Sequence, residues 1–241
     1  MTEQRTNEYG QPIGPNLVGW TPRPLPPRTP MAGAFASIEP LDVARHAADL
    51  YAAYGSAADG RDWTYMFSGP YPTFDDFVAW ATTAAASTDP MHHAIIDMST
   101  GKAVGTAAYL RIDATYGVIE IGNIAYSPSL QRSPLATEAM FLFMRRVFDE
   151  LGYRRYEWKC DHLNARSRAA ASRYGYSFEG IFRQAVMYKG RSRDTAWYSI
   201  IDSEWPTLKA AYEQWLDPTN FAEDGAQRTR LADCIAMARE R

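Results

Sequence analysis

The sequence has few of the features that mark zinc proteins, disulfide-rich proteins or membrane proteins. It contains 2 cysteines, Cys160 and Cys234, which lie far apart and outside any CxxC or Cys/His spacing. We therefore expect no metal site, and two reduced thiols rather than a disulfide. No apolar run approaches the roughly 18 residues that a membrane-spanning helix needs. The first residues are polar, unlike a secretory signal peptide. These absences predict a cytoplasmic protein with no membrane partner.

A strong net charge is also missing. Lys and Arg number 25 against 28 Asp and Glu, so the formal net charge is -3. Such a balance gives no global attraction to nucleic acid, and we expect no nucleic-acid partner. The 241 residues, of which 46% are hydrophobic and 22% charged, suit one globular domain with additions.

Proline is concentrated near the N-terminus, with seven prolines from Pro12 to Pro30. Because proline fixes φ and removes a hydrogen-bond donor, this stretch cannot be helix or central strand. We predict an extended arm over residues 1–34, a domain over 35–216 and a helical tail over 217–241. Leu17, Val18 and Trp20 either pin the arm to the domain or to another subunit, or the arm is a disordered tail. The arm and the tail together suggest a homodimer.

The central region has the pattern of a mixed α/β protein. Thr73 and Ser203 are the expected N-caps of two of its helices, and a turn near Gly190 joins two strands into a hairpin. Hydrophobic periodicity and turn residues predict strands over 35–41, 92–98, 103–111, 117–127, 154–160, 176–190 and 194–202, and helices over 42–54, 73–87, 135–152, 164–174, 203–216 and 229–240.

Four consecutive segments carry a resemblance to a known family. They are GVIEIGNIAYSP, then QRSPLATEAM opening a helix, then a strand ending at Cys160, then NARSRAAASRYGYSFEG. This order resembles the GNAT superfamily of N-acetyltransferases, in particular its RimJ/RimL-type branch, over roughly residues 38–216. The resemblance implies a GNAT fold, with a central mixed, mostly antiparallel seven-stranded sheet and flanking helices. It also implies an acetyl-CoA-dependent N-acetyltransferase acting on the primary amine of a protein N-terminus, an amino acid or a small amine.

The loop before the third long helix carries the first motif. A loop feeding a helix N-terminus presents unpaired N–H groups and the positive end of the helix dipole, which suits a pyrophosphate. The family loop has Gly where Pro134 stands here; proline removes one donor yet is favoured at the first helical position. An ordinary helix start is the alternative. The resemblance assigns cofactor binding to Gln131, Arg132, Ser133, Leu135, Ala136 and Thr137.

The resemblance places further cofactor contacts on either side of this loop. Asn164 would bind the pantetheine chain, unless it serves only as an N-cap. Ser167, one turn on, would return a proton to the leaving thiolate as a catalytic residue. Ile124 and Ala125 would contribute backbone groups from the preceding strand.

The acid–base residues are less clear. Ala171 stands where some relatives have a catalytic Tyr, and Val186 where RimL-like enzymes have a Glu. Glu120 is the remaining carboxylate for catalysis, acting directly or through water, with a structural ion pair as the alternative. Further candidates are His92, His93 and His162.

The acceptor pocket is expected between the loop over 55–72 and the hairpin tip over 188–193. Trp63, Tyr65 and Tyr71 are candidate substrate-binding residues, although packing of the first two helices explains them equally well. Direct attack of the amine on the thioester is favoured over a covalent route through Cys160, which has no readable His or acid partner. The alternative function is a catalytically weak acyl-CoA-binding or sensing protein.

Overall fold

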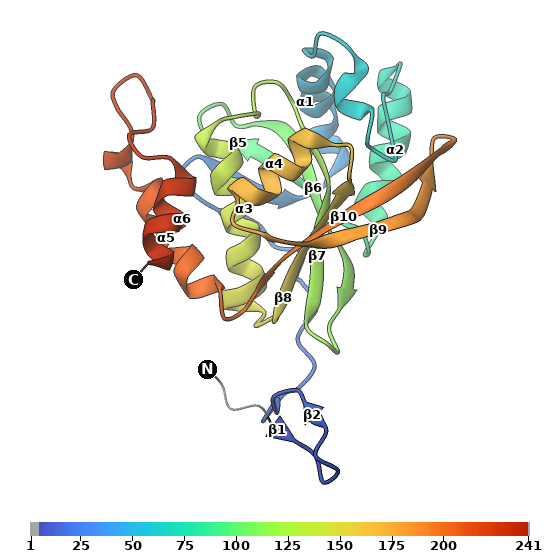
Figure 1. Ribbon diagram of the computed structural model, residues 1–241. Coiled ribbons are helices and arrows are strands. Elements are labelled where there is room, and N and C mark those ends of the chain that lie inside the picture. The colour runs from blue at the N-terminus through green and yellow to red at the C-terminus, as the bar shows by residue number, and fades with distance from the viewer. Residues whose placement is uncertain (1–4, 241) are drawn as a thin grey trace.

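A computed structural model describes residues 5–240, and its centre is one large mixed sheet (Figure 1). Neighbouring strands in this sheet are antiparallel except for β7 and β8, which are parallel. The sheet has eight strands, one more than predicted, because Met31 and Ala32 at the end of the arm pair with β4. In spatial order the strands are β3 (Met31–Ala32), β4 (Ala36–Pro40), β5 (Met91–Asp97), β6 (Lys102–Asp113), β7 (Val118–Tyr126), β8 (Arg155–Asp161), β10 (Arg191–Ile201) and β9 (Ser177–Tyr188).

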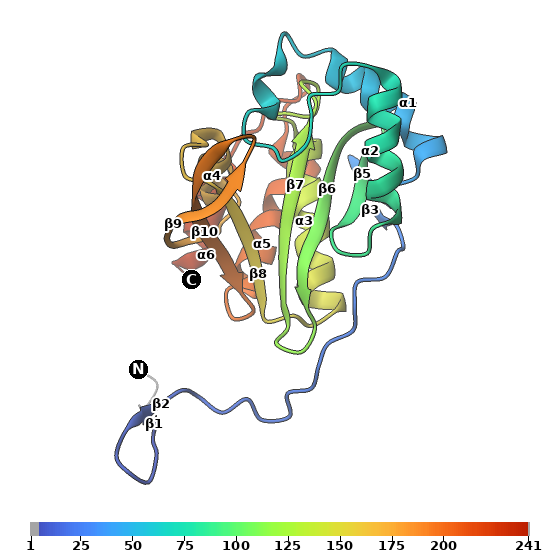
Figure 2. The same cartoon turned by 90° about the vertical axis from the view of Figure 1, so that its right-hand side faces the viewer.

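Helices cover both faces of the sheet, which gives a three-layer arrangement (Figures 1 and 2). One face carries α1 (Val43–Gly55) and α2 (Phe74–Ala86), over β5 and β6. The other carries α3 (Pro134–Arg145), with α5 (Trp205–Leu216) and α6 (Leu231–Arg239) packed outside it. The remaining helices are α4 (Ala165–Arg173) and the short η1 (Gly60–Trp63), η2 (Arg146–Glu150) and η3 (Pro218–Asn220). None of the helices among residues 5–240 has the length and apolar character to cross a membrane.

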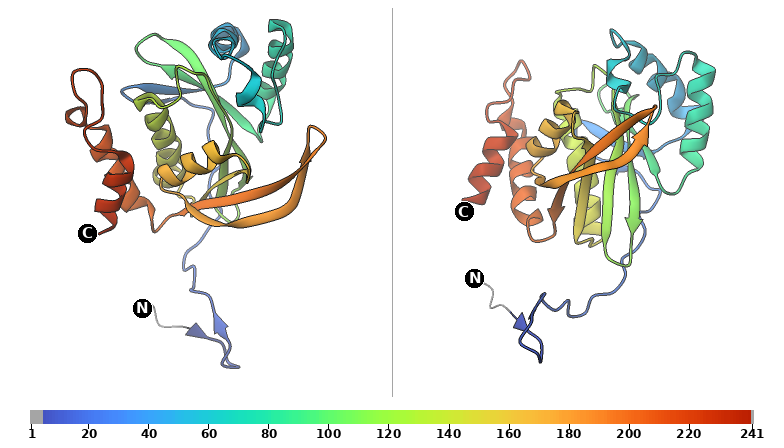
Figure 3. Two further views of the ribbon diagram at one scale, coloured as in Figure 1. Left: turned by 45° about the horizontal axis from the view of Figure 1, so that its top comes forward. Right: turned by 45° about the vertical axis from the view of Figure 1, so that its right-hand side comes forward.

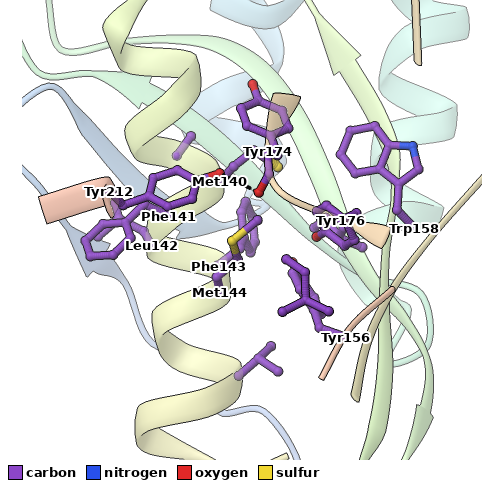
Figure 4. Close-up of a cluster of buried hydrophobic side chains, with 14 of the residues drawn as sticks. Met140, Phe141, Leu142, Phe143, Met144, Tyr156, Trp158, Tyr174, Tyr176 and Tyr212 are labelled. Atoms are coloured by element: carbon purple, nitrogen blue, oxygen red, sulfur yellow. Dashed lines mark hydrogen bonds between the residues drawn. The ribbon is translucent and has the colours of Figure 1, made fainter. Parts of the chain in front are cut away.

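The larger of two cores lies between α3 and the sheet (Figure 4). Aromatic side chains fill it, each stabilising the fold by about 1.5–3 kcal/mol through burial of apolar area. Tyr156 and Tyr176 pack with ring centroids 5.8 Å apart, and Trp158 lies 5.7 Å from Tyr176. The smaller core, centred on Phe77 and Leu50, holds α1 and α2 on the opposite face. Together the two cores fix the position of the strands that carry the site.

Local capping signals explain where most helices begin. Thr73 is the predicted N-cap of α2 and forms a capping box with Asp76, and Asp42 and Asn164 cap α1 and α4 through their side chains. The prediction of Ser203 as an N-cap is wrong by one residue. The turn after β10 continues to Glu204, whose N–H donates to the carbonyl of Ile201 at 2.9 Å, so α5 begins later.

An aromatic residue helps to pin the N-terminal arm to the domain. The indole N–H of Trp20 donates to the carbonyl of Thr115 at 3.0 Å, and its ring lies over Gly117. Leu17 and Val18 are exposed, and the hairpin of β1 (Arg5–Thr6) and β2 (Pro12–Ile13) lies away from the body (Figures 1 and 2). Of the three residues predicted to pin the arm to the domain, Trp20 is confirmed, whereas Leu17 and Val18 are not.

A buried carboxylate fastens the end of the arm to α3. Glu138 accepts hydrogen bonds from the N–H groups of Ala34, Phe35 and Ala36 at 2.8, 2.6 and 2.7 Å. Three N–H donors satisfy a carboxylate that would otherwise be costly to bury. The first strand of the domain is therefore registered against the helix that follows the predicted phosphate loop.

Candidate functional site

The parallel strands β7 and β8 separate part-way along the sheet. They pair from Val118 with Arg155 to Ile121 with Trp158, and among residues 5–240 no later pair joins them. Beyond this point β7 stays paired only to β6, with a register shift around Asn123, whose φ is 49°. The predicted cofactor residues Ile124 and Ala125 lie in this half-paired segment. Backbone groups on its free side are thus available to an extended ligand.

The loop from Gln131 leads directly from β7 into α3. Ser133 caps the helix: its hydroxyl accepts from the N–H of Ala136 at 3.1 Å and donates to the carbonyl of Leu130 at 2.7 Å. Pro134 is the first helical residue, one residue before the predicted start at 135, at a position that favours proline. Proline at this position therefore leaves the helix start intact.

Three backbone N–H groups at this helix start are available to an anion. Within the described range 5–240, the N–H groups of Arg132, Ser133 and Leu135 donate to no acceptor. Arg132 has a φ of 60°, in the left-handed region that lets successive N–H groups converge. Together with the dipole of α3, they form a nest for an anion such as a pyrophosphate. The loop thus fits the phosphates of coenzyme A despite Pro134.

Two of the predicted loop residues point inward instead. Ala136 is buried and its N–H is already bound by Ser133. Thr137 is fully buried, and its hydroxyl accepts from the Arg173 guanidinium at 3.0 Å. The hydroxyl that we expected Thr137 to add to the nest is thus engaged between α3 and α4. Any cofactor contact of these two residues stays a prediction.

An acidic residue from a distant loop joins the phosphate loop to α4. The side-chain amide of Gln131 donates to Asp62 at 3.1 Å and to the carbonyl of Tyr126 at 3.0 Å. The other carboxylate oxygen of Asp62 accepts from Arg166 at 3.0 Å. Asp62 thus bridges groups that follow β7 and β8, across the point where these strands separate. Asp62 was not predicted from the sequence, because no local pattern links residues 62 and 131.

Ser167 lies beside Trp158, the last residue of β8 to pair with β7. The indole N–H of Trp158 donates to the Ser167 hydroxyl at 3.0 Å, and the Asn164 side chain caps α4 by accepting from the Ser167 N–H at 3.1 Å. Burial raises the pKa of the Cys160 thiol, and a hydrogen bond with Ser167 opposes this. The indole occupies one lone pair of the Ser167 hydroxyl and leaves its proton for another acceptor, such as the Cys160 sulfur.

Glu120 lies on the sheet face opposite α3 and is almost fully buried. Its carboxylate is 2.7 Å from the Arg111 guanidinium and 3.0 Å from Lys159, which also contacts Glu157 at 2.6 Å. Burial raises the pKa of Glu120, and the two cations oppose that shift. This ion pairing favours the structural alternative for Glu120, and its catalytic role stays a prediction.

The three candidate histidines have different surroundings. His92 and His93 are buried on β5, and burial lowers their pKa values to about 4 and about 3. His93 packs against the rings of Tyr109 and Phe143, inside the core beneath α3. Only His162 lies near Ser167 in the chain, after the last residue of β8. No group of three or more His, Cys, Asp or Glu in residues 5–240 could hold a metal ion.

The candidate substrate-binding aromatics have different surroundings. Trp63 packs edge-on against Tyr54 and Tyr71, and Tyr71 in turn packs against Phe77 of α2. These contacts favour the packing alternative for Trp63 and Tyr71. The hydroxyl of Tyr65 instead donates to the carbonyl of Leu163 at 3.3 Å, at the end of β8. Tyr65 therefore lies nearer to the separated strands.

The tip of the β9–β10 hairpin lies against the loop between α1 and α2 (Figure 3). That these two segments flank an acceptor pocket stays a prediction. The Lys189 ammonium donates to the carbonyls of Trp63 and Gly69 at 2.9 and 2.7 Å. Arg191 donates to the carbonyl of Thr64 at 2.5 Å. The hairpin and the loop are thus connected through backbone carbonyls rather than carboxylates.

This geometry matches a known family. A family model for the acetyltransferase (GNAT) domain matches residues 37–177. The chain belongs to the GNAT family of acetyltransferases. GNAT acetyltransferases use acetyl-CoA as the acetyl donor. Among curated proteins, none is similar enough to match.

Solved GNAT structures share the whole fold. A GCN5-related N-acetyltransferase from Brucella melitensis is 49% identical, with a TM-score of 0.89 over 91% of this chain and 100% of that one. A GNAT-family protein from Chromobacterium violaceum ATCC 12472 is 39% identical, with a TM-score of 0.75 over 81% of this chain and 98% of that one. The microcin C7 self-immunity acetyltransferase, solved with acetyl-CoA and AMP, shares the fold at 20% identity and a TM-score of 0.59. That match covers 70% of this chain and 93% of the other.

Proposed function

We propose that this GNAT protein is an N-acetyltransferase that acetylates a primary amine by direct attack on the thioester. The amine belongs to a protein N-terminus, an amino acid or a small molecule. The observation that carries the proposal is the anion nest at Arg132, Ser133 and Leu135, beside the point where β7 and β8 separate. Placement in the RimJ/RimL-type branch belongs to the proposal and rests on the sequence motifs. The proposal also includes a cytoplasmic location, a homodimer, and the absence of nucleic-acid and membrane partners.

The residues that would hold coenzyme A come from three elements. The loop residues Gln131 to Thr137 would bind its phosphates, Ile124 and Ala125 would pair with its extended arm, and Asn164 and Ser167 would face it from α4. Coenzyme A supplies an acetyl group on a thioester. The protein contributes binding and orientation, which account for much of the rate in acyl transfer without a dedicated base.

Ser167 is the proposed proton donor. Its hydroxyl accepts from the Trp158 indole N–H at 3.0 Å and keeps its own proton to donate, which a cofactor thiolate would take in competition with the Cys160 sulfur. Glu120 remains in the proposal as the candidate base, although its ion pairs with Arg111 and Lys159 favour a structural role. Tyr65 is the best placed of the proposed acceptor residues, since its hydroxyl reaches the end of β8.

A catalytically weak acyl-CoA binder or sensor is the second candidate. Two observations favour it: Ala171 and Val186 occupy the positions of the acid and the base of relatives, and Asp62 engages Gln131 in the phosphate loop. This protein would still bind acetyl-CoA through the same nest but would turn it over slowly.

Release of free thiol from acetyl-CoA, followed over a panel of amines, separates the two candidates. The panel should include short peptides with free N-termini, amino acids and small amines. Amine-dependent thiol release would support the enzyme. Binding of acetyl-CoA without release over any amine would favour the sensor, and no binding would contradict both.

A further inference from the structure

Arg193 is a buried cation without a carboxylate partner. Its side chain belongs to β10 and the residue is 7% exposed, yet no carboxylate among residues 5–240 lies within 4 Å of its guanidinium. Its Nε donates to the Thr195 hydroxyl at 3.2 Å. Its guanidinium carbon lies 5.4 Å from the ring centre of Phe67 and 5.9 Å from that of Tyr188. A buried arginine is normally paired, so this one is poised to bind an anion.

The acidic residues nearest to Arg193 are already engaged. Asp161 accepts from the Tyr188 hydroxyl at 2.7 Å and from the N–H of Leu163 at 2.9 Å. Asp194 accepts from the N–H of Gln184 at 2.7 Å. Neither is within ion-pair distance of the Arg193 guanidinium.

The other cations of the hairpin add to the positive charge there. Lys189 and Arg191 donate to backbone carbonyls, and no acidic group in the described range forms an ion pair with them. The region around the hairpin tip is therefore electropositive, although the whole chain has a formal net charge of -3.

Arg193 lies level with the segment where the thioester would be held. Tyr198 on β10 pairs with Trp158, the last residue of β8 to pair with β7. A strand rises about 3.3 Å per residue, so Arg193 lies about 16 Å along β10 beyond Tyr198. By the same rise, Ala125 lies about 13 Å along β7 beyond Ile121. The side chain of Arg193 follows those of Thr195 and Trp197 on the face that carries Lys159 and Glu120. This is the face opposite α3.

We propose that Arg193 binds a carboxylate carried by the acceptor, so that the substrate is an amine with a carboxylate a few bonds away. This inference rests on the proposed function. The planar guanidinium suits bidentate recognition of a carboxylate, and it lies between Phe67 of the α1–α2 loop and Tyr188 of β9. The carboxylate belongs either to a free amino acid or to an acidic side chain near the N-terminus of a peptide.

Matched acceptors test the inference. The first pair is L-serine and L-serinamide, and the second is the peptide amides Ser-Asp-Gly and Ser-Asn-Gly. Each is assayed by thiol release with wild-type protein and with Arg193→Gln and Arg193→Lys. Arg145→Gln is the matched control, because Arg145 lies on α3 against Phe141, on the other side of the sheet.

The wild type is expected to prefer the carboxylate member of at least one pair by about tenfold to hundredfold in kcat/KM. A preference in the first pair identifies amino acids, and a preference in the second identifies acidic peptides. Arg193→Gln should abolish the preference, Arg193→Lys should keep part of it, and Arg145→Gln should keep it whole. Equal rates within both wild-type pairs, or a preference that survives Arg193→Gln, would overturn the inference.

A binding measurement separates this inference from the proposed function. The products N-acetylserine and N-acetylserinamide are titrated calorimetrically into wild-type and Arg193→Gln protein, which requires no turnover. Tighter binding of N-acetylserine, lost in Arg193→Gln, supports the carboxylate site even if no amine is acetylated. Equal binding of the two products to the wild type contradicts the site, while turnover of neutral amines alone would leave the acetyltransferase proposal standing.

Discussion

The indole N–H of Trp158 points at the hydroxyl oxygen of Ser167, 3.0 Å away. This contact joins Trp158, the last residue of β8 to pair with β7, to the first turn of α4. It directs the hydroxyl proton away from the indole, because an oxygen that accepts from the indole must offer its proton elsewhere. A buried core residue thus helps to orient the proposed proton donor.

Replacing Trp158 with phenylalanine should slow proton transfer, because it removes the indole N–H while keeping an aromatic ring. We expect Trp158→Phe to lower kcat about tenfold and Ser167→Ala to lower it about a hundredfold. The KM for acetyl-CoA should change little in either. The double variant should be no slower than Ser167→Ala, because both changes act on one hydroxyl. Steady-state kinetics of the three variants measure this.

Trp205→Phe is the matched control for Trp158→Phe. Trp205 is equally buried, and its indole donates to Asp149 at 2.6 Å, away from the site. It should lose stability but keep kcat. Equal loss of kcat in both tryptophan variants would show that Trp158 acts only through the fold.

Asp62 and the cofactor phosphates would share the same partners. Because Asp62 binds Gln131 and Arg166, neutralising it should release both for the cofactor. We expect Asp62→Asn to bind coenzyme A about threefold more tightly, since partly exposed charge pairs contribute little. Calorimetric titration measures the change. Asp59→Asn, in the same loop but paired to Arg61, should leave the affinity unchanged, and weaker binding by Asp62→Asn would refute the competition.

The role of Glu120 can be assigned by measuring the stability and the catalytic rate of a Glu120→Gln variant separately. We expect Glu120→Gln to reduce the free energy of unfolding by about 1–3 kcal/mol, because Arg111 and Lys159 lose a buried partner. We also expect kcat to stay within about threefold. Urea denaturation and pH–rate profiles measure the two effects. A loss of the acidic limb of kcat, with a rate fall beyond a hundredfold, would instead identify Glu120 as the base.

The buried histidine His93 should make the fold sensitive to acid. Its pKa is about 3 in the folded protein because burial disfavours the charged ring, against about 6.5 when unfolded. The unfolded chain therefore binds more protons between these values, and stability falls as the pH drops below about 6.5. The slope contributed should approach about 1.4 kcal/mol per pH unit.

His93→Phe should flatten this dependence, since phenylalanine suits the space between Tyr109 and Phe143. Urea denaturation at pH 7 and pH 5 compares the variant with wild type. His162→Asn is the control for loss of an imidazole, because His162 is partly exposed. Equal slopes in wild type and His93→Phe would disprove the assignment.

Local signals in the sequence account for most of the fold. Thr73 caps α2, Pro134 begins α3 and Gly175 takes a φ of 90° after α4. Threonine is favoured as an N-cap, proline at the first helical position and glycine where φ is positive. The eighth strand was missed because Met31 and Ala32 are too short a segment to show a pattern. They form a strand only because β4 offers an edge.

The site was predictable only where its residues are neighbours in sequence. Ser133 and Asn164 cap their helices as the motifs indicate. The contact between Asp62 and Gln131 spans 69 residues and depends on how a loop crosses the sheet. The burial of Arg193 likewise depends on tertiary packing, since its sequence neighbours Ser192 and Asp194 read as a polar turn.

The anion nest at the start of α3 is the central element of the account, and one backbone donor can be removed from it. Leu135→Pro deletes the Leu135 N–H within the first helical turn, where proline is tolerated. Asp75→Pro makes the same change in the first turn of α2 and is the control. Calorimetric titration with acetyl-CoA should show one site per chain in the wild type and Asp75→Pro, and about tenfold weaker binding in Leu135→Pro. No binding by the wild type, or undiminished binding by Leu135→Pro, would contradict the account.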